Sequence, residues 1–261
     1  MGISLAGLLF VPQFGSNDVL AFDSDRAPQP SLSVAGLGLG NRIHWSAFAN
    51  GESPCLLLAD TCLVAVDPAS HAVRWATAPG LLRFCCGLAP LPEHGIVVAA
   101  NADETLFAHR LSSGERVGSL VVPGLGCYLA ADPLTGVIFG NGVPVKDQCA
   151  IACFSWTAGS GFKTQGFVDA AGSRDSLCPL TVVPPAPGKR VSHLVVGTRY
   201  SPELLVLALP GLALVHRHVL RGIEVSALAA DPWGAALAVG DASEKEIRVV
   251  AWPLAGMPEL E

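Results

Sequence analysis

The sequence predicts an all-β fold built from repeated antiparallel sheets. A unit of two short apolar runs joined by a polar turn occurs six times, and successive units begin 40 to 57 residues apart. The runs are four to six residues long, rich in Leu and β-branched residues, and bounded by turn formers, which favours strands over helices. No stretch combines a sustained helical period with capping residues at both ends. The chain is therefore expected to be nearly all strand.

Each unit is expected to form a β-hairpin. In chain order, the paired runs are 8–11 with 19–22, 56–59 with 63–67, 96–99 with 106–108, 137–139 with 150–154, 194–197 with 204–207, and 236–239 with 247–252. Because most of these runs are apolar without alternation, both of their faces should be buried, as in a sheet packed between two other sheets.

Further strands are expected on either side of these hairpins. Residues 127–131 and 225–229 each precede a hairpin and are followed by an Asp-Pro turn, in which Pro sets φ and a later Gly accepts positive φ. Residues 72–75 and 214–218 each follow a hairpin. Four strands in about 45 residues make the blade of a β-propeller. We therefore predict a single propeller domain over residues 1–261.

The predicted propeller has about six four-stranded blades. A seventh could lie in residues 155–190, but four prolines there favour a loop. Residues 3–6 or 254–260 would have to complete a terminal blade, because the first hairpin has little room before it and the last has no clear strand after it. A ring closed within one chain predicts a monomer, whereas open strand edges would favour dimerisation.

Two segments resemble known propeller repeats. The stretch from Leu63 to Trp75 is similar to the quinoprotein type, which ends in an Asp, a turn and a hydrophobic-basic-Trp strand, and the stretch from Phe10 to Phe22 resembles the YVTN type. The chain thus resembles the broad propeller superfamily with YVTN, NHL and quinoprotein-like repeats. It departs from the quinoprotein pattern at His71, where that pattern prefers Gly, and no repeat carries the Trp-Asp or Gly-His pairs of WD40 chains.

Composition narrows the class of protein. The 261 residues are 51% hydrophobic and 15% charged, which is too apolar for a disordered chain, and no run approaches the roughly 20 apolar residues of a membrane helix. The net charge of −6 argues against nucleic acid as a partner. Residues 1–10 have neither the basic start nor the cleavage site of a signal peptide. We expect a soluble, intracellular protein of the cytoplasm.

The eight cysteines lie mostly among apolar residues. Free cysteine behaves as a small buried hydrophobe, and thiols stay reduced inside the cell. We therefore expect reduced core thiols, with a disulfide between neighbouring strands as the alternative.

Polar residues end the first strand of every hairpin, and they could form a metal site. They are Gln13, Asp60, Asn101, Asn141, Thr198 and Asp241. If the blades superpose, these side chains ring the propeller tunnel, where Asp and Asn oxygens would suit calcium. A distant resemblance to propeller lactonases implies a metal held by Asp60, Asn101, Asn141 and Asp241, although no Glu lies near the first strand. The interpretation we favour is that these residues start the hairpin turns by bonding the backbone.

Cations beside aromatic residues are the candidate partner contacts. Arg42 lies near Trp45, and Arg199 precedes Tyr200, a composition typical of interface hot spots. His216 and His218 share one face of a strand and could hold zinc, but a solvated surface pair is the favoured interpretation. Several of the five tryptophans are expected to pack between blades.

The motifs do not complete a catalytic set. The chain has no nucleophile elbow, and its glycine-rich segment 36–40 matches no phosphate-binding pattern. We therefore predict a non-catalytic scaffold without a cofactor, which binds a protein or peptide on one face of the ring and uses residues 155–190 as a partner-specific loop. The alternative is a metal-dependent, lactonase-like hydrolase whose tunnel calcium polarises a carbonyl. A quinone-dependent dehydrogenase is a third, weaker reading.

Overall fold

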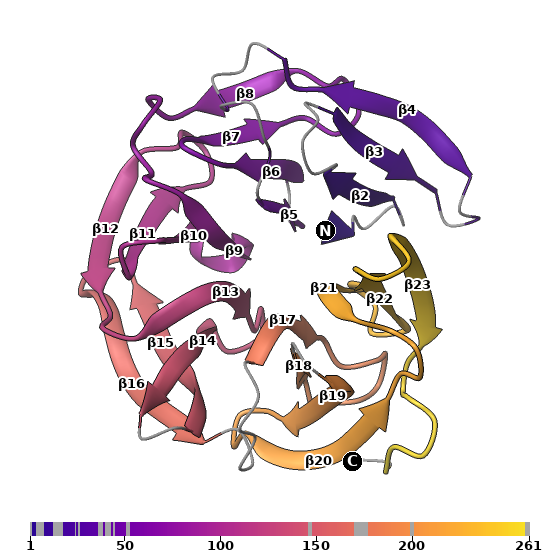
Figure 1. Ribbon diagram of the computed structural model, residues 1–261. Coiled ribbons are helices and arrows are strands. Elements are labelled where there is room, and N and C mark those ends of the chain that lie inside the picture. Colours follow the sequence, from indigo (N-terminus) through magenta and orange to yellow (C-terminus); the bar gives the residue numbers. More distant parts are fainter. Residues whose placement is uncertain are drawn as a thin grey trace. The chain divides into compact units, whose positions relative to one another are not determined.

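The fold consists of six antiparallel sheets. The computed structural model describes residues 2–3, 8–12, 18–23, 25, 27–35, 39, 43, 45–50, 53–145, 148–169, 177–198 and 201–258. In these residues the regular structure is β-strand, apart from one 3₁₀ turn, η1 (Pro92–His94). Within each sheet the strands follow one another in chain order, as Figure 1 shows. No helix in this part of the chain is long and apolar enough to span a membrane.

The first three sheets belong to one compact unit, the N-terminal unit, which comprises Met1–Pro123 and Trp156–Phe162. The first sheet contains β1 (Gly2–Ile3), β2 (Leu9–Pro12), β3 (Asp18–Phe22) and β4 (Pro28–Ser33). The second contains β5 (Trp45–Ala49), β6 (Cys55–Ala59), β7 (Leu63–Val66) and β8 (Val73–Ala76). The third contains β9 (Cys85–Leu91), β10 (Ile96–Asn101), β11 (Thr105–Arg110) and β12 (Arg116–Val121).

The other three sheets lie mainly in a second compact unit, the C-terminal unit, which comprises Gly124–Ser155 and Lys163–Glu261. The fourth sheet contains β13 (Leu125–Ala131), β14 (Val137–Val145), β15 (Gln148–Thr157) and β16 (Gly161–Asp169). The fifth contains β17 (Leu177–Val183), β18 (His193–Thr198), β19 (Ser201–Ala208) and β20 (Ala213–Val219). The sixth has three strands, β21 (Val225–Ala230), β22 (Ala236–Asp241) and β23 (Glu246–Ala251).

The sheets confirm the predicted all-β class and the number of blades. All six predicted hairpins form, as the second and third strands of the six sheets. Of the segment 3–6 that was expected to complete a terminal blade, only Ile3 is described. It forms the short strand β1 with Gly2, and the two residues pair with Leu9 and Phe10 in the first sheet. The alternative segment, residues 254–260, contributes no strand within its described part, 254–258.

The prediction of a loop over residues 155–190 was wrong for most of that stretch. It contains β16, the last strand of the fourth sheet, and β17, the first strand of the fifth. Proline does not exclude a strand here, because Pro179 lies within β17, at the edge of a sheet, where a residue without an N–H is tolerated. A loop remains over residues 184–192, between β17 and β18.

The core lies on both faces of the middle strands. Every residue of β6, β7, β10 and β18 is buried, as the unbroken apolar runs predicted. Cys55, Cys85 and Cys153 are buried thiols that form no disulfide. Burial raises the pKa of Cys85 to about 12 and that of Cys153 to about 11. The raised pKa keeps these thiols protonated at neutral pH, and the thiolate is the reactive form. They therefore serve as apolar core side chains.

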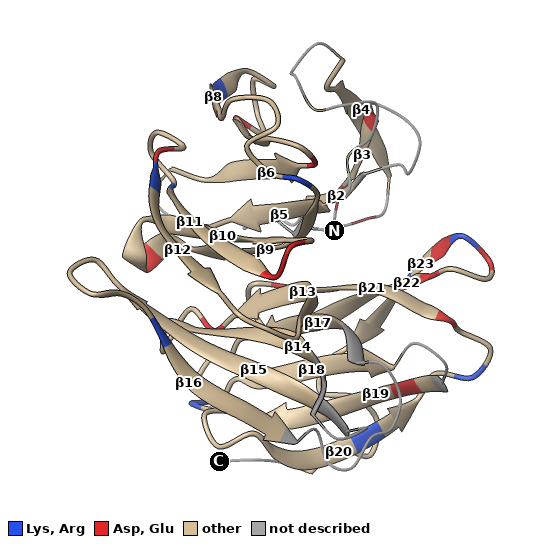
Figure 2. Ribbon diagram, turned by 60° about the vertical axis from the view of Figure 1, so that its left-hand side comes forward, with Lys and Arg blue, Asp and Glu red and all other residues tan. Residues whose placement is uncertain are grey.

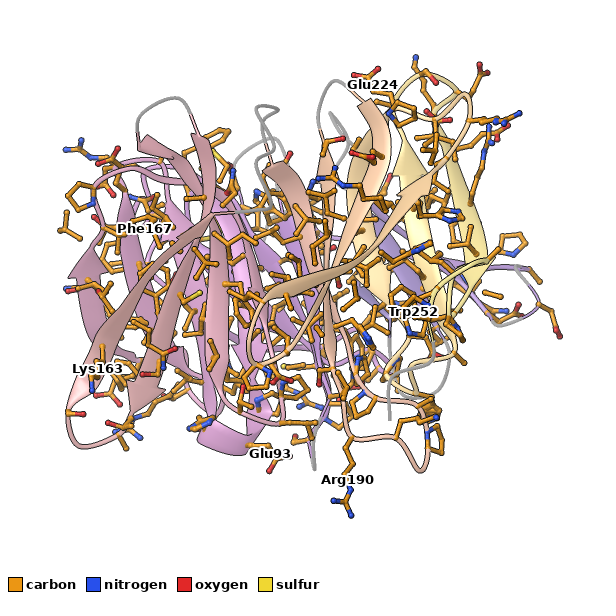
Figure 3. The ribbon with its side chains drawn as sticks, turned by 90° about the horizontal axis from the view of Figure 1, so that it is seen from below. Glu93, Lys163, Phe167, Arg190, Glu224 and Trp252 are labelled. Carbon is orange, nitrogen blue, oxygen red and sulfur yellow. The ribbon has the colours of Figure 1, made fainter. Side chains whose placement is uncertain are left out.

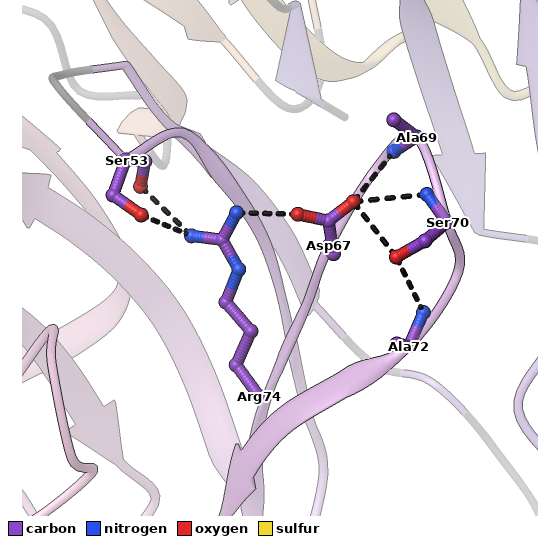
Figure 4. A network of polar contacts seen from close by, with 6 residues as sticks. All are labelled: Ser53, Asp67, Ala69, Ser70, Ala72 and Arg74. Carbon is purple, nitrogen blue, oxygen red and sulfur yellow. Dashed lines mark hydrogen bonds and ion pairs between the residues drawn. The ribbon is translucent and has the colours of Figure 1, made fainter.

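In the second sheet, the Asp and the basic residue of the quinoprotein-like pattern, Asp67 and Arg74, stabilise the turn between β7 and β8 (Figure 4). Asp67 Oδ1 accepts the N–H groups of Ala69 at 3.1 Å and Ser70 at 2.9 Å. Its Oδ2 pairs with Arg74 Nη2 at 2.5 Å, and Arg74 Nη1 donates to the carbonyl of Ser53 at 3.0 Å. The Arg74 guanidinium holds the pKa of the Asp67 carboxyl well below its usual range. The pattern therefore fixes the turn between β7 and β8.

Candidate functional site

Three Asx side chains in the second strand of a sheet bond to backbone amides. Asn101 and Asp241 end their strands as predicted, whereas Asn141 lies within β14, which continues to Val145. In each of the three sheets the side-chain Oδ1 accepts an N–H from within the first strand or from the residue before it, close to a register shift between the first two strands. The pairs are Asn101 with Phe84 (3.0 Å), Asn141 with Tyr128 (2.7 Å) and Asp241 with Glu224 (3.1 Å). The side-chain oxygen thus accepts a hydrogen bond from a backbone N–H close to the point where the pairing of the first two strands is irregular.

The remaining members of this set have varied surroundings. Asp60 is buried, Thr198 Oγ1 donates to the Glu203 carbonyl at 3.2 Å, and Gln13 lies outside the described residues. Asp60 and Asn101 belong to the N-terminal unit, and Asn141 and Asp241 to the other. Within the described ranges, no three His, Cys, Asp or Glu side chains are grouped as metal ligands. The calcium site stays a prediction.

Asp241 accepts several further hydrogen bonds. Its Oδ1 also accepts the N–H and the hydroxyl of Ser243, at 3.0 and 2.7 Å, and Oδ2 lies 3.6 Å from Arg248 Nη2. The Ser243 hydroxyl and the two amides lower the pKa of this carboxyl. These contacts hold the hairpin between β22 and β23 against the start of β21.

Replacing Asn101 with alanine is expected to destabilise the fold by about 1–3 kcal/mol, because the partly buried N–H of Phe84 loses its acceptor. The loss should be the same in calcium and in EGTA. Urea unfolding followed by tryptophan fluorescence in both buffers measures it. If calcium stabilises the natural chain and this stabilisation disappears in Asn101→Ala, the oxygen is a metal ligand and the structural interpretation is wrong.

Only one of the four predicted interface residues, Trp45, lies within the described residues. Arg42, Arg199 and Tyr200 lie outside the described residues. Trp45 begins β5 and is only partly exposed, because it packs against the core cluster of the second and third sheets. Their role in partner binding stays a prediction.

Three of the five tryptophans pack against a neighbouring sheet. Trp75 of β8 donates its Nε1–H to the carbonyl of Leu111, in the third sheet, at 2.7 Å. Trp156 lies against Gly118 of β12. Trp252 meets the ring of His193, a β18 residue, edge to face at 5.5 Å. These contacts confirm the packing role predicted for several tryptophans.

His216 and His218 lie on β20, the outer strand of the fifth sheet. Their ring centroids are 5.9 Å apart. The described residues bring no further His, Cys, Asp or Glu to this pair as a metal ligand. Both residues are only partly exposed, and His216 Nε2 is buried, so the pair is less solvated than the favoured interpretation expected.

The C-terminal unit brings three connections together at one end of its strands. The loop 184–192 contacts the turn 132–136 through Ser192, whose hydroxyl donates to Asp132 Oδ1 at 3.1 Å. It contacts the turn 231–235 at Gly234, where a Cβ would overlap the carbonyl oxygen of Pro184 and lie 3.1 Å from the Ala186 nitrogen. We call these three segments the docking face. The central loop holds both turns in place.

Each turn is also fixed internally by its first residue, an aspartate. Asp132 accepts the Leu134 N–H at 3.3 Å and the Thr135 hydroxyl at 2.7 Å. Asp231 accepts the N–H groups of Trp233 at 3.2 Å and Ala235 at 3.1 Å. The residues at the tips of the turns are therefore presented by a rigid backbone.

The docking face exposes large apolar side chains beside cations. Leu134 is 62% exposed and Trp233 is 42% exposed. Lys189 and Arg190 are exposed on the central loop, and Figure 3 shows Arg190 extending away from the ribbon. Hydrogen bonds hold the carboxylates of Asp132 and Asp231 within the face, whereas Lys189 and Arg190 are exposed on the loop. Such a face suits a partner segment that is apolar and acidic.

The sequence contained one signal for this site. The two turns share the sequence Ala-Ala-Asp-Pro, which indicated a repeat but not a site. Leu134 and Trp233 follow the prolines at corresponding places. The contact of Asp132 with Ser192 joins positions 60 residues apart, and no sequence pattern indicated it.

Comparison with known proteins identifies the fold alone. No family model matches the chain, and no curated protein matches it. The crystal structure of the β-propeller domain of Cps50 (Swd1) from Myceliophteria thermophila is similar, with a TM-score of 0.66 and 12% identity over 96% of this chain and 95% of that one. The chain therefore has a β-propeller fold. Since 1388 chains of solved structures match, the likeness selects no function.

Proposed function

We propose that this protein is a scaffold that binds a protein or peptide partner through the docking face. The observation that carries the proposal is the exposure of Leu134 and Trp233 on turns that one loop, 184–192, holds together. Aromatic residues on a rigid backbone are the usual anchors of protein interfaces, because little conformational entropy is lost when they bind.

The chemistry of the face defines the partner. Lys189 and Arg190 are exposed on the loop that contacts both turns, while hydrogen bonds hold the two aspartates within the face. We expect a segment with an apolar side chain that packs on Trp233 and with Asp or Glu beside the cations. Electrostatic complementarity of this kind contributes specificity and association rate more than affinity.

A random peptide library displayed on phage tests the proposal. Selected peptides should be rich in acidic and apolar residues, and Trp233→Ala with Leu134→Ala should weaken their binding at least tenfold, which is the usual loss for an interface anchor. Charge reversal at Lys189 and Arg190 should lower the association rate. Titration by fluorescence anisotropy measures the affinity, and stopped-flow mixing measures the rate.

Val121→Ala is the matched control, because Val121 is 64% exposed but lies on β12 in the N-terminal unit. It should leave binding unchanged. Peptides that bind equally well to the natural chain and to the Trp233→Ala, Leu134→Ala variant would overturn the docking face as the site.

A further inference from the structure

The strand β23 occupies an unusual position in its sheet. In the other five sheets the third strand pairs on both sides and a fourth strand forms the outer edge. The sixth sheet ends at its third strand, and within the described ranges β23 pairs with β22 alone. The outer side of β23 thus lies where the other blades have another strand.

The edge of β23 is regular. β22 and β23 pair over six consecutive positions without a register shift. By contrast, β4, β8, β12 and β20 each meet their neighbour through a ladder with a shift. Bulges of this kind distort an edge and discourage further pairing. β23 has no such bulge and no proline, so its backbone is suited to accept a strand.

The ladder defines which backbone groups point outward. The N–H of Trp252 donates to the Ala235 carbonyl at 2.9 Å and continues the ladder. Since hydrogen-bonded positions alternate in antiparallel pairs, Arg248 and Val250 also direct their N–H and C=O groups toward β22. Ile247, Val249 and Ala251 therefore direct theirs away from the sheet.

The chain after β23 packs elsewhere. Leu254 is buried and Met257 packs against the core cluster of the fifth and sixth sheets. Gly256 lies close to His216, a residue of β20. Residues 252–258 form no strand, and therefore this segment does not supply the fourth strand of the sheet.

We propose that the outer edge of β23 accepts an extended segment of a partner protein as the fourth strand of the sixth sheet. Backbone bonds to Ile247, Val249 and Ala251 would supply affinity, and alternate side chains would supply specificity. On one face of the sheet those side chains would lie beside the same three apolar residues, of which Val249 is 38% exposed. Apolar or β-branched residues at every second position suit that strip.

Charge at the end of the strand selects a basic segment. The tip of the β22–β23 hairpin carries Glu244, Lys245 and Glu246, seen in Figure 2 as red and blue on the loop. Asp241, Arg248 and Glu224 lie nearby. Together with the tip they make four carboxylates and two cations, so this end of the sheet has a net charge of −2. A Lys or Arg at the matching end of the segment would compensate it.

The hairpin end of this edge lies away from the docking face, whereas its other end adjoins the turn 231–235, because Ala251 pairs with Ala236 and the Trp252 N–H donates to the Ala235 carbonyl. Figure 3 shows Glu224 and Arg190 at opposite ends of the C-terminal unit. A second copy of the chain is the alternative occupant, and protection that rises with protein concentration alone would identify it. The two proposals are tested by different variants.

Hydrogen exchange with a synthetic peptide tests the proposal. The probe alternates valine and threonine and ends in two lysines, and a fully N-methylated version is the control. In the free protein the amides of Ile247, Val249 and Ala251 should exchange rapidly, while those of Arg248 and Val250 are protected. Excess probe should slow the first three at least tenfold and leave the other two unchanged, and the methylated peptide should have no effect.

Val249→Pro removes an outward N–H without breaking a hydrogen bond to β22. The variant should therefore have the circular dichroism spectrum of the natural chain, and its affinity for the probe peptide should be at least tenfold lower. Val249→Thr is the matched control and should bind as the natural chain does. If Val249→Pro fails to fold, the exchange pattern of the natural chain decides the question. Unchanged exchange of the three amides in excess probe overturns the proposal. Protection that rises with protein concentration alone also overturns it, because a second copy would then be the occupant.

Discussion

Gly114→Ala is expected to destabilise the N-terminal unit by about 2–4 kcal/mol. Gly114 has a φ of +73°, and a Cβ at this position would lie 2.5 Å from Trp75 Cε3. The indole is poorly placed to move, since it is buried and its Nε1–H is bonded to the Leu111 carbonyl. The alanine therefore combines backbone strain with overpacking.

The same turn also holds a buried histidine. The ring of His109 has no exposed surface, and its Nδ1 lies 2.9 Å from the Gly114 carbonyl. Because a carbonyl only accepts, Nδ1 carries the proton. Burial lowers the pKa of His109, so its contribution to stability is complete above about pH 6.5, the unfolded pKa, and declines as the pH falls below that value. Urea unfolding of Gly114→Ala should be measured at pH 7.5, where the histidine is neutral in both states.

Gly80→Ala is the matched control for the strain. Gly80 has a φ of +76°, and a Cβ there would meet nothing within 4 Å, so the expected loss is only about 1 kcal/mol. In a Trp75→Leu background the clash is removed, and Gly114→Ala should then cost no more than Gly80→Ala. An equal cost of the two single variants in the natural chain would contradict the packing of Trp75 on this glycine.

The hairpins were predictable because their strands are buried on both faces. A run such as Leu56–Ala59 or Ile96–Ala99 is buried on both faces, so its sequence is apolar at every position and ends at a turn-forming residue. The Asp-Pro turns were also predictable, since an Asp side chain bonds to the backbone two residues further on and Pro fixes its own φ. Local chemistry thus predicted the fold class and the six repeats.

The outer strands expected over residues 72–75 and 214–218 are present as β8 and β20, whereas β16 and the docking face could not be predicted in this way. β16 is largely exposed, so its sequence carries little apolar pattern and was taken for a loop. Leu134 and Trp233 are exposed only because a tertiary contact positions their turns, and that contact depends on Ser192 and Gly234. A single sequence contains no pattern that pairs residues so far apart.

Trp156→Ala is expected to cause the largest loss of stability among the variants discussed, about 3–5 kcal/mol. The indole is 5% exposed, lies edge to face with Phe162 at 4.8 Å, and contacts β12 at Gly118, where a Cβ would be 2.5 Å from its Cζ3. No side chain at Gly118 can fill the space that the indole leaves. Thermal and urea unfolding should both show the loss.

Trp233→Ala is the comparison variant for Trp156→Ala, because it makes the same substitution at a more exposed position. It should cost less than Trp156→Ala, because Trp233 is 42% exposed and Trp156 only 5%. A circular dichroism melt close to that of the natural chain, together with weaker binding of the selected peptides, would assign Trp233 to recognition. If Trp233→Ala instead destabilised the fold as much as Trp156→Ala, its loss of binding would report unfolding, and the docking face would lose its main anchor.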